Sequence, residues 1–404
     1  MNIVLSVDSI ERLRFFKRII LGSSDDVNFF VVTHLPLVFL YLKSINSSNV
    51  KIYFIKGDRH KDHLQQRMHD PSLELLTNKL DKNEELTLFK SYLGELESIF
   101  SNPTLIDYIL VWNGQQLLNT AFATFARQCS IEVIYMEISN FFSKMFIDSE
   151  GVNAKSYIYS NSSDLDKFPT VDNEKHQAWL FDYIQRKNNI LPQSQASTLD
   201  IIERAVNKLL FSFVSPMHTK FVFRTMLNSR PKPVNFNSYE FDEISGLFDV
   251  VFCPLQVSTD TQLLVNSDYN NLDQINQALD ISSRKSKTLV VKLHPAETDK
   301  KSVDRIFQMR KKYGFKIVNS SVKDIFDVSS EVIVNNSTVG LEAMLFGLDT
   351  TVIGRAIYSE FNKERLISYI HNYLLSGVDY FSEDVININL IVEHSKKQHG
   401  IKKC

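Results

Sequence analysis

Cysteine, glycine and proline are scarce in this sequence, and each scarcity excludes a class of protein. The 404 residues include 3 cysteines, 12 glycines and 10 prolines. The three scattered cysteines are too few for a disulfide framework or a cysteine-rich zinc site, and they favour a reduced, cytoplasmic setting. The low glycine content excludes a collagen-like chain, and together with the few prolines it predicts long regular elements with few glycine loops.

An excess of one charge sign and long hydrophobic runs are also missing. The 45 Lys and Arg residues and 47 Asp and Glu residues give a formal net charge of −2. Proteins that work mainly on nucleic acid usually have a clear basic excess, so no nucleic-acid partner is expected. No apolar run reaches the roughly 18 residues of a membrane-spanning helix, and the N-terminus lacks the pattern of a signal peptide.

The end of the chain, residues 394–404, is basic. Such a tail can attach to an anionic membrane, because each basic residue near the surface contributes about 1 kcal/mol. The alternative interpretation is a frayed terminus. The expected localisation is therefore cytoplasmic, and peripheral contact with the cytoplasmic face of the inner membrane stays open.

Short apolar runs rich in β-branched residues alternate with longer amphipathic stretches in the first part of the chain. Continuous apolar strands separated by helices favour a parallel sheet covered on both faces. The predicted strands are 2–7, 28–33, 51–55, 106–112 and 132–135. The predicted helices are 10–21, 35–42 and 115–127, and the charged segment 73–100 predicts one or two more.

The middle of the chain differs, because residues 173–188 and 198–228 carry helical periodicity without strands. Pro231 and Pro233 then stop any helix, so residues 229–237 are interpreted as a linker. After the linker the alternation resumes. The predicted strands are 250–254, 288–293, 316–318, 332–335 and 350–353, and the predicted helices are 273–281, 302–313 and 338–346.

The predicted fold class is α/β, with two doubly wound Rossmann-like domains facing a central cleft and a helical insertion. In such sheets ligands bind at the carboxyl ends of the strands. The expected domains are an N-terminal Rossmann-like domain (1–170), a helical region and linker (171–237), a C-terminal Rossmann-like domain (238–357) and C-terminal helices that can cross back to the N-terminal domain (358–404).

The first candidate site follows the predicted strand 288–293. Lys292 lies near the end of this strand, and His294 and Pro295 come at its exit. Because Pro295 rigidifies the turn, the imidazole is held at the carboxyl end of the strand, where it can donate to a phosphate oxygen and offset charge on a leaving group. The alternative is a histidine that caps a loop.

A second candidate lies where another strand ends and helix 338–346 begins. The free backbone N–H groups and the helix dipole make this an anion site, with Gly340 in the first turn and two further donors, the hydroxyls of Ser337 and Thr338. Glu342 lies one turn further on the same side and can accept hydrogen bonds from ribose hydroxyls. The alternative is a capped helix, with Ser337 as N-cap and Glu342 solvated.

Two carboxylates complete the candidate residues. Asp260 lies with Gln256 in a polar turn after strand 250–254, and it can act as a nucleophile or base toward an anomeric carbon; the alternative is a helix N-cap. Glu137 directly follows a strand and can act as general acid or base. Two carboxyl groups about 5 Å apart are what a retaining glycosyl transfer needs.

Other signals are weaker. Residues 112–114 end a strand and either contact an acceptor or form a turn. His60 and His63 have the spacing of two metal ligands, but their charged surroundings favour a solvated helix. Neither a GxGxxG fingerprint nor a P-loop is present. No metal ion is expected, in agreement with the lack of an Asp-x-Asp motif near a strand end.

Taken together, several segments resemble the bacterial capsule-polysaccharide Kdo transferases, a retaining, GT-B-like family that uses CMP-β-Kdo. The resemblance covers most of the chain, with gaps and moderate identity. The segments that carry it are ERLRFFKRI (11–19), WNG (112–114), MEISNFFSKMFIDSEGVNAKS (136–156), CPLQVSTDTQ (253–262), KLHPAE (292–297) and NSTVGLEAMLFG (336–347).

The resemblance implies that Asp260 is the nucleophile, which forms a covalent Kdo–enzyme intermediate, and that Glu137 is the acid/base. It also implies that His294, Ser337 and Glu342 hold CMP. The remaining predicted donor-site residues are Lys292, Pro295, Gln256, Thr338 and Gly340, and Lys292 and Arg355 are candidates to hold the carboxylate of the donor sugar.

The expected function is therefore retaining transfer of Kdo from CMP-β-Kdo to a glycan or glycolipid acceptor in surface-polysaccharide biosynthesis, without a cofactor. The alternatives are another cytidine-nucleotide enzyme, either a sialyltransferase or a CDP-glycerol glycerophosphotransferase, and a non-catalytic glycan- or lipid-binding protein of capsule assembly. The acceptor, the linkage and the number of sugars added stay open.

Overall fold

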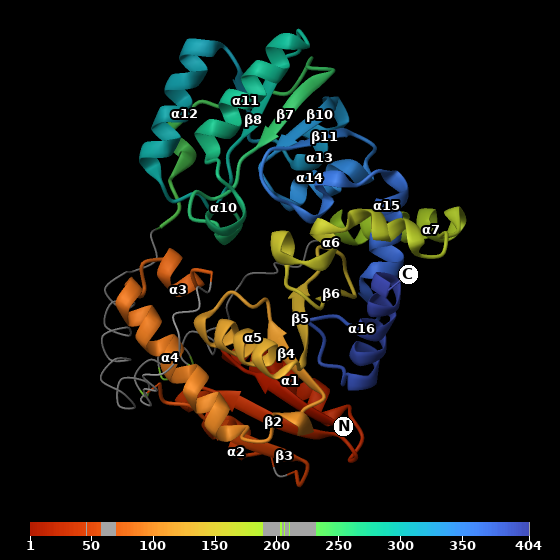
Figure 1. The fold of residues 1–404 in the computed structure, drawn as a ribbon. Coiled ribbons are helices and arrows are strands. Elements are labelled where there is room, and N and C mark those ends of the chain that lie inside the picture. Colours follow the sequence, from red (N-terminus) through yellow and green to blue (C-terminus); the bar gives the residue numbers. More distant parts are fainter. Residues whose placement is uncertain are drawn as a thin grey trace. The chain divides into compact units, whose positions relative to one another are not determined.

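The computed structural model describes residues 1–45, 47–57, 70–188, 203, 206, 210 and 232–403 (Figure 1). These residues divide into two compact units. Unit 1 takes its described residues from 1–158, 163–229 and 367–404, and unit 2 takes them from 159–162 and 230–366. None of the described helices is long and apolar enough to span a membrane.

Unit 1 is built on a seven-stranded sheet with the strand order β12-β6-β5-β4-β1-β2-β3. Neighbours among β1 to β5 run parallel, whereas β6 pairs antiparallel with β5 and β12 pairs antiparallel with β6. The strands are β1 (Asn2–Ser6), β2 (Asn28–Thr33), β3 (Val50–Phe54), β4 (Tyr108–Trp112), β5 (Glu132–Ile138), β6 (Lys144–Asp148) and β12 (Leu375–Ser376). Because β1, β4 and β5 are parallel neighbours, their carboxyl ends meet at one edge of the sheet.

The sequence encodes several helix starts in unit 1 directly. Ser9 caps α1 by accepting a hydrogen bond from the Arg12 N–H, and Asp81 and Glu84 form a reciprocal capping box at the start of α4. The helices of unit 1 are α1 (Ile10–Leu21), α2 (Pro36–Lys43), α3 (Leu73–Leu76), α4 (Lys82–Ile99), α5 (Leu117–Cys129), α7 (Asn173–Asn188) and α16 (Ile388–Lys403), with short turns at Pro103–Leu105 and Asn153–Lys155 and a π-helix at Tyr369–Tyr373.

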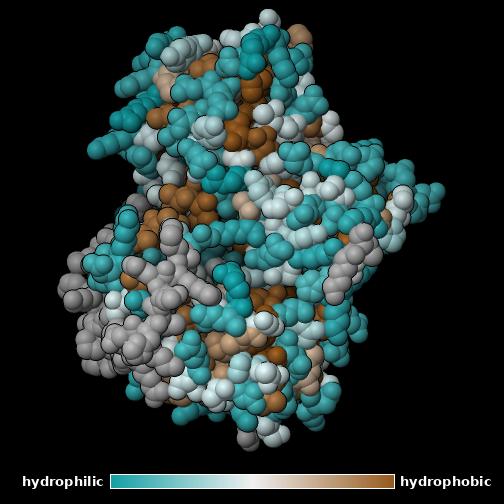
Figure 2. All heavy atoms as spheres, viewed as in Figure 1, coloured by the Kyte–Doolittle hydropathy of each residue, from teal (hydrophilic) through white to brown (hydrophobic). Residues whose placement is uncertain are grey.

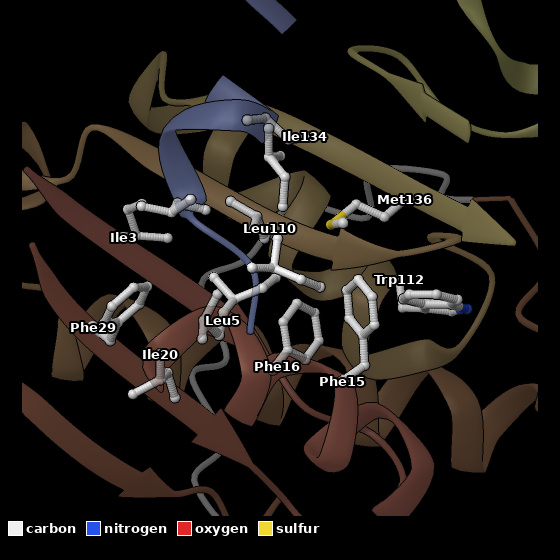
Figure 3. Packing of buried hydrophobic residues seen from close by; sticks show 14 of the residues in the cluster. Ile3, Leu5, Phe15, Phe16, Ile20, Phe29, Leu110, Trp112, Ile134 and Met136 are labelled. Carbon is white, nitrogen blue, oxygen red and sulfur yellow. The ribbon is translucent and has the colours of Figure 1, made fainter. Parts of the chain in front are cut away.

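The core of unit 1 lies between the sheet and α1, where large side chains from both elements are fully buried (Figure 3). Phe15 and Phe16 of α1 face Leu5 of β1 and Trp112 of β4. The rings of Phe15 and Trp112 pack edge to face with centroids 5.4 Å apart. This packing fixes α1 against the sheet, and so it positions the side chains at the start of α1 beside the strand ends.

Unit 2 is built on a five-stranded, fully parallel sheet with the order β11-β10-β7-β8-β9. The strands are β7 (Val250–Pro254), β8 (Leu289–Lys292), β9 (Lys316–Ile317), β10 (Ser329–Val334) and β11 (Asp349–Val352). The helices are α10 (Thr261–Asn266), α11 (Asn271–Arg284), α12 (Lys300–Tyr313), α13 (Val322–Val328) and α14 (Thr338–Leu345), with short turns at Phe236–Ser238 and Ile357–Glu360. Three further elements, α6 (Tyr157–Ser160), the turn Ser162–Lys167 and α15 (Lys363–Ser368), lie where the chain passes between the units.

Helix α12 illustrates how a charged sequence folds onto an apolar core. It buries Val303 and Ile306, while the other side carries charged residues, visible as the hydrophilic surface over this helix in Figure 2. Asp299 caps its start and Gly314 ends it in the left-handed conformation at φ 76°. The pattern is that of an amphipathic helix on one face of a parallel sheet.

The predicted α/β class with two mainly parallel sheets is confirmed. Residues 73–100 form two helices, as one form of the prediction has it. The prediction missed the strands β6 and β12, which extend the sheet of unit 1 antiparallel. The basic tail is not frayed, because α16 is helical to Lys403 and buries Ser395 and Gln398. Residues 59–63 and most of the predicted helical segment 198–228 lie outside the described residues.

Candidate functional site

The first candidate site lies in unit 2, at the carboxyl ends of β7, β8 and β10. These strands are neighbours in a parallel sheet, so the three loops that follow them emerge at the same edge. The loops contain Asp260, His294 and Ser337, which the sequence singled out. The sheet topology of unit 2 thus brings together residues that are far apart in the sequence.

Asp260 ends the loop after β7 and is the N-cap of α10. Its Oδ1 accepts a hydrogen bond from the Gln262 N–H at 2.8 Å, as the structural alternative predicted. Capping uses only this oxygen, and Oδ2 makes no hydrogen bond to the described residues. The cap therefore fixes the orientation of the carboxylate and leaves one oxygen for chemistry.

His294 is exposed in the loop after β8, and the Asp260 carboxylate acts on it electrostatically. Partial loss of solvent lowers the pKa of His294, with Lys292 acting in the same direction, whereas Asp260 and Glu297 oppose this shift. Nδ1 accepts a hydrogen bond from the Ala296 N–H at 3.1 Å, so in the neutral ring Nε2 carries the proton and is a donor. Pro295 follows in the same turn and is exposed.

Glu297, which the sequence analysis did not single out, connects two loops of this site. Its Oε2 accepts hydrogen bonds from the backbone N–H and the hydroxyl of Ser258, both at 2.8 Å, and its Oε1 accepts from the N–H groups of Thr298 and Asp299. The residue is buried. It holds the loop that leads to Asp260 against the loop that contains His294.

Asn336 connects the third loop to α10. Its amide donates hydrogen bonds to the carbonyl oxygens of Gln262 at 2.9 Å and Asn266 at 3.1 Å, while its backbone N–H points at Oε1 of Gln256 at 3.4 Å. Gln256 is buried, and its carbonyl accepts from the amide of Asn271 at 2.7 Å. Gln256 thus serves the internal packing of the loops, and its predicted contact with the donor stays a prediction.

The start of α14 has the form of an anion site. Ser337 is the N-cap, and its hydroxyl accepts a hydrogen bond from the Val339 N–H at 3.2 Å, as the structural alternative predicted. The hydroxyl proton is still able to donate to a ligand. Thr338 is exposed and Glu342 is partly exposed, one turn apart on the same helix.

Gly340 has a packing reason to be glycine. A Cβ atom at this position would lie 2.6 Å from the Tyr358 hydroxyl and 2.7 Å from Cγ2 of Val334. The Tyr358 hydroxyl in turn donates to the Ser337 carbonyl. Gly340 therefore lets Tyr358 approach the first turn of α14, and no ligand is needed to explain it.

The two candidates for the donor carboxylate differ in their surroundings. Lys292 is partly buried, and loss of solvent lowers its pKa. Arg355 makes an ion pair with Asp268, with 2.7 Å between the guanidinium and the carboxylate. Lys292 is therefore the better placed cation of the two, because Arg355 already has an anionic partner.

The second candidate site lies in unit 1, at the carboxyl ends of β1, β4 and β5. Glu137 was predicted to follow a strand directly, but it lies inside β5, opposite Phe146 of β6, because β5 continues to Ile138; it is partly buried. Loss of solvent raises the pKa of Glu137, and Asp8 acts in the same direction, while Arg12 and a hydrogen bond with Asn113 oppose the shift. A carboxyl group with a raised pKa beside a cation suits general acid/base work.

Asp8 and Glu74 also belong to this site, although the sequence analysis did not name them. Asp8 follows β1 and accepts a hydrogen bond from the Asn119 amide at 2.7 Å; loss of solvent raises its pKa. Loss of solvent, with Asp8 nearby, raises the pKa of Glu74 to about 6. The signal for Asp8 was the same as for Glu137, a carboxylate at the end of a buried strand.

Arg12 is the cation of this site. Its guanidinium lies over the Trp112 ring, 4.1 Å from the centroid, and donates to the Tyr380 hydroxyl at 2.6 Å. Asn113 and Gly114 have positive φ angles of 43° and 75°, so residues 112–114 form a turn. The interpretation as a turn is confirmed. The Asn113 side chain contacts Glu137, and contact of residues 112–114 with an acceptor stays a prediction.

Among the residues that the structure describes, no group of three or more His, Cys, Asp or Glu side chains is arranged to hold a metal ion. His60 and His63 lie outside the described residues, so the metal interpretation of that segment is a prediction only. Asp148, at the end of β6, is fully buried, and it accepts hydrogen bonds from the N–H groups of Glu150, Gly151 and Tyr157 and the hydroxyl of Tyr373. It has a structural role.

Comparison with known proteins supports the resemblance in unit 2. Residues 224–361 match the family described as capsule polysaccharide biosynthesis protein, which confirms the resemblance to capsule-polysaccharide proteins over this segment. The segment contains the unit 2 candidates from Gln256 to Glu342. No curated protein sequence matches the chain.

Solved structures similar to the chain include two transferase structures of KpsC from Thermosulfurimonas dismutans. The one described as a beta Kdo 2,7 transferase has 16% sequence identity and a TM-score of 0.46, over 98% of this chain and 100% of that chain. The beta Kdo 2,4 transferase has 14% identity and a TM-score of 0.38, over 73% and 88%. MurG of Acinetobacter baumannii has 9% identity and a TM-score of 0.27, over 100% and 99%. Values this low assign no role to any residue of this chain.

Proposed function

We propose that this protein is a retaining glycosyltransferase that moves Kdo from CMP-β-Kdo to a glycan or glycolipid acceptor in the synthesis of a surface polysaccharide. The observation that carries the proposal is in unit 2. There, Asp260 and His294 follow two neighbouring parallel strands at the same edge of the sheet and interact electrostatically, in the segment that matches the capsule polysaccharide family.

The donor would bind at the start of α14 in unit 2. Its phosphate would accept hydrogen bonds from the backbone N–H groups there, from the Ser337 hydroxyl and from Nε2 of His294. Glu342 would accept from the ribose hydroxyls. Lys292 would pair with the carboxylate of the sugar, because it is a partly buried cation at the same sheet edge.

The first chemical step would use Asp260 as nucleophile. An oxygen of its carboxylate bonds to the anomeric carbon, the bond from that carbon to the phosphate oxygen breaks, and CMP leaves with the electron pair. Fixed donors stabilise the charge on the phosphate, so the proposal assigns no role to a metal ion. The cap on Asp260 supports this role because it holds one oxygen and leaves the other available.

In the second step the acceptor hydroxyl would displace Asp260, and Glu137 would take the hydroxyl proton. Two inversions at the same carbon give net retention. The raised pKa of Glu137 supports the assignment, because a base with a pKa nearer to neutral transfers protons more effectively. The mechanism requires both carboxylates to act on one sugar.

The experiment is incubation of the full chain with CMP-Kdo generated in situ, followed by intact mass of the protein and by CMP release. A covalent Kdo adduct is expected on wild-type protein without acceptor. Asp260→Asn should retain CMP binding, since Asn caps a helix as well as Asp does, but lose transfer and the adduct. Residual activity above a few per cent would rule out Asp260 as nucleophile.

Asp299→Asn is the matched control for this variant. Asp299 caps α12 in unit 2 as Asp260 caps α10, with its Oδ1 accepting from Lys301 and Ser302. The substitution keeps a capping residue and removes one negative charge, and full activity is expected. Loss of activity in both variants would indicate a general effect on unit 2 rather than a missing nucleophile.

Two rivals share the unit 2 chemistry. A sialyltransferase or a CDP-glycerol glycerophosphotransferase would use the same cytidine nucleotide site with another donor, and a donor screen with mass detection of the product separates these. A non-catalytic glycan-binding protein would release no CMP from any donor. The cluster of carboxylates with raised pKa values in unit 1 disfavours that alternative, because buried acids are costly without a task.

A further inference from the structure

Four basic side chains gather in unit 1 away from the carboxylate site. Lys144 lies on β6, Lys175 and His176 lie at the start of α7, and His371 lies on the π-helix Tyr369–Tyr373. Nδ1 of His176 and Nε2 of His371 are 3.1 Å apart. The Lys144 ammonium donates to the hydroxyl of Ser376, on the neighbouring strand β12, at 2.8 Å.

Burial and basic neighbours both lower the pKa values of two members of this cluster. Loss of solvent, followed by Lys144, His176 and Lys175, lowers the pKa of His371 to about 4. Loss of solvent and Lys175 lower the pKa of Lys144 to about 8. The neighbouring groups that act on Lys144 and His371 are basic, so no carboxylate among the described residues offsets the effect of burial on either pKa.

Among the four side chains, Lys144 gives the strongest indication of an anion site, because the residue is only 8% exposed. A buried ammonium costs several kcal/mol unless an anion pairs with it. In the part of the chain that the structure describes, no carboxylate pairs with Lys144, Lys175 or His371. A neutral hydroxyl acceptor is a weak substitute, so an anionic partner from outside the chain would complete the group.

Aromatic packing holds the two imidazoles in place. The His176 ring stacks on Trp179 at 22°, Trp179 stacks on Tyr183 at 14°, and His371 meets the edge of Trp179 with centroids 5.4 Å apart. Phe141 packs edge-on against Trp179 from the loop before β6. π-Helical turns are rare and often lie at functional sites. The cluster is thus fixed before any ligand arrives, which lowers the entropic cost of binding.

We propose that Lys144, Lys175, His176 and His371 form a binding site for an oxyanion, namely the carboxylate of an acidic sugar or a phosphate group. Such an anion accepts charge-assisted hydrogen bonds from ammonium and imidazole donors at once. It would also neutralise the buried charge of Lys144. The identification of this oxyanion as part of the acceptor rests on the proposed function. The binding of an oxyanion at this site does not.

The test is a titration of the full-length protein, without any nucleotide sugar, at constant ionic strength. One series uses inorganic phosphate and the other uses free Kdo, and each is followed by NMR of the histidine ring protons over a range of pH. A saturable change is expected. At saturation the pKa of His371 should rise by about one unit or more, because an anion stabilises the protonated ring. The signal is assigned from the spectrum of His371→Gln.

Lys144→Met tests the buried cation. The methionine keeps most of the apolar stem and removes the charge, so binding should weaken about tenfold or more. The same variant should unfold at a higher temperature than wild type, because an unpaired buried charge is lost. Lys175→Met, at an exposed position, should also weaken binding and cannot disturb the core. Lys17→Met, an exposed lysine on α1, is the control and should bind normally.

The result of the anion titration does not depend on the result of the glycosyltransferase test. Saturation by phosphate alone or by Kdo alone supports the site and identifies the oxyanion. The proposal is wrong if neither anion gives a saturable change, or if both Lys144→Met and Lys175→Met bind as wild type does. Because no CMP-Kdo is used, the proposed glycosyltransferase activity can fail while this site is confirmed, and the reverse.

Discussion

The Glu297 carboxylate accepts two hydrogen bonds from Ser258, one from the backbone N–H and one from the hydroxyl, both at 2.8 Å. This contact joins the loop after β7 to the loop after β8. The first loop ends in Asp260 and the second contains His294. The relative position of the proposed nucleophile and the proposed phosphate ligand therefore depends on a buried residue, whose backbone N–H also donates to the His294 carbonyl oxygen at 3.0 Å.

Glu297→Gln should disturb this arrangement. The carboxylate accepts four hydrogen bonds, and an amide can accept on only one side, so at least one pair of donors is left unsatisfied. We expect unit 2 to lose about 2 kcal/mol of unfolding free energy and the KM for the donor to rise. The measurements are hydrogen exchange of the β7 and β8 amides and steady-state kinetics.

Ser258→Ala is the graded control for that variant. It removes the hydroxyl hydrogen bond and keeps the backbone one, so it should cost about 1 kcal/mol. An equal loss in both variants would mean that Glu297 acts through the single hydroxyl contact. No loss in either would contradict the role of Glu297 in joining the loops.

Substitutions of the two charged neighbours of Glu137, Arg12 and Asp8, should shift its pKa in opposite directions. Arg12 lowers its pKa and Asp8 raises it. Arg12→Met should therefore move the pKa of Glu137 up, and Asp8→Asn should move it down. If Glu137 is the base, activity is gained as pH rises through its pKa, so the acidic limb of the rate profile should move to higher pH in Arg12→Met and to lower pH in Asp8→Asn.

Carbon-detected NMR of the Glu137 carboxyl group measures the same shifts without any assay of activity. Glu137→Gln identifies the signal. Agreement between the NMR pKa and the acidic limb supports Glu137 as the base. Shifts seen by NMR without movement of the acidic limb would show that another group limits the rate, and shifts of the same sign in both variants would contradict the electrostatic account.

Much of the architecture follows from the sequence pattern. The strand Val250–Pro254 and the helices Ile10–Leu21 and Asn173–Asn188 were predicted to the residue. Continuous apolar runs define buried parallel strands, and polar caps define helix starts. The antiparallel strand β6 was missed because its apolar run, between Lys144 and Asp148, is short, and because one of its two partners in the sheet, β12, comes from the far end of the chain.

The site was predictable only where a side chain lies close to the carboxyl end of a strand or in the loop that follows it. This rule found Asp260, His294 and Glu137. It did not find Glu297, because its importance comes from the hydrogen bonds it accepts across two loops. It did not find the basic cluster either, since those side chains come from a strand, a helix and a π-helix that only the tertiary structure brings together.

A substitution of Gly340 tests whether this glycine is required for packing. In Gly340→Ala the new Cβ would lie 2.6 Å from the Tyr358 hydroxyl, closer than real contacts allow. We expect a loss of roughly 1 to 3 kcal/mol of stability in unit 2. The measurement is the rate at which the buried thiol of Cys253 in β7 reacts with an alkylating agent, followed by peptide mass.

Tyr358→Phe provides the matched background for that substitution. Removing the hydroxyl opens space for the methyl group, so Gly340→Ala should cost less in Tyr358→Phe than in wild type. Gly400→Ala, on α16 with nothing within 4 Å of its added Cβ, should be neutral or slightly stabilising. Equal costs of Gly340→Ala in both backgrounds would show that the Tyr358 contact is not the cause.

Glu74 predicts a pH-dependent gain in stability. Its pKa is raised from 4.5 to about 6 in the folded state, so the folded chain binds a proton more tightly than the unfolded chain does. The resulting stability is present below the unfolded pKa and is lost as pH rises through the folded one. Glu74→Gln removes the charge, so it should raise the unfolding free energy of unit 1 at pH 7 by roughly 2 kcal/mol and change it little at pH 4.

Both tryptophans of the chain, Trp112 and Trp179, lie in unit 1, so urea unfolding followed by tryptophan fluorescence reports this unit. Glu393→Gln, exposed on α16, should have no effect at either pH, and an equal gain for Glu74→Gln at both pH values would contradict the assignment.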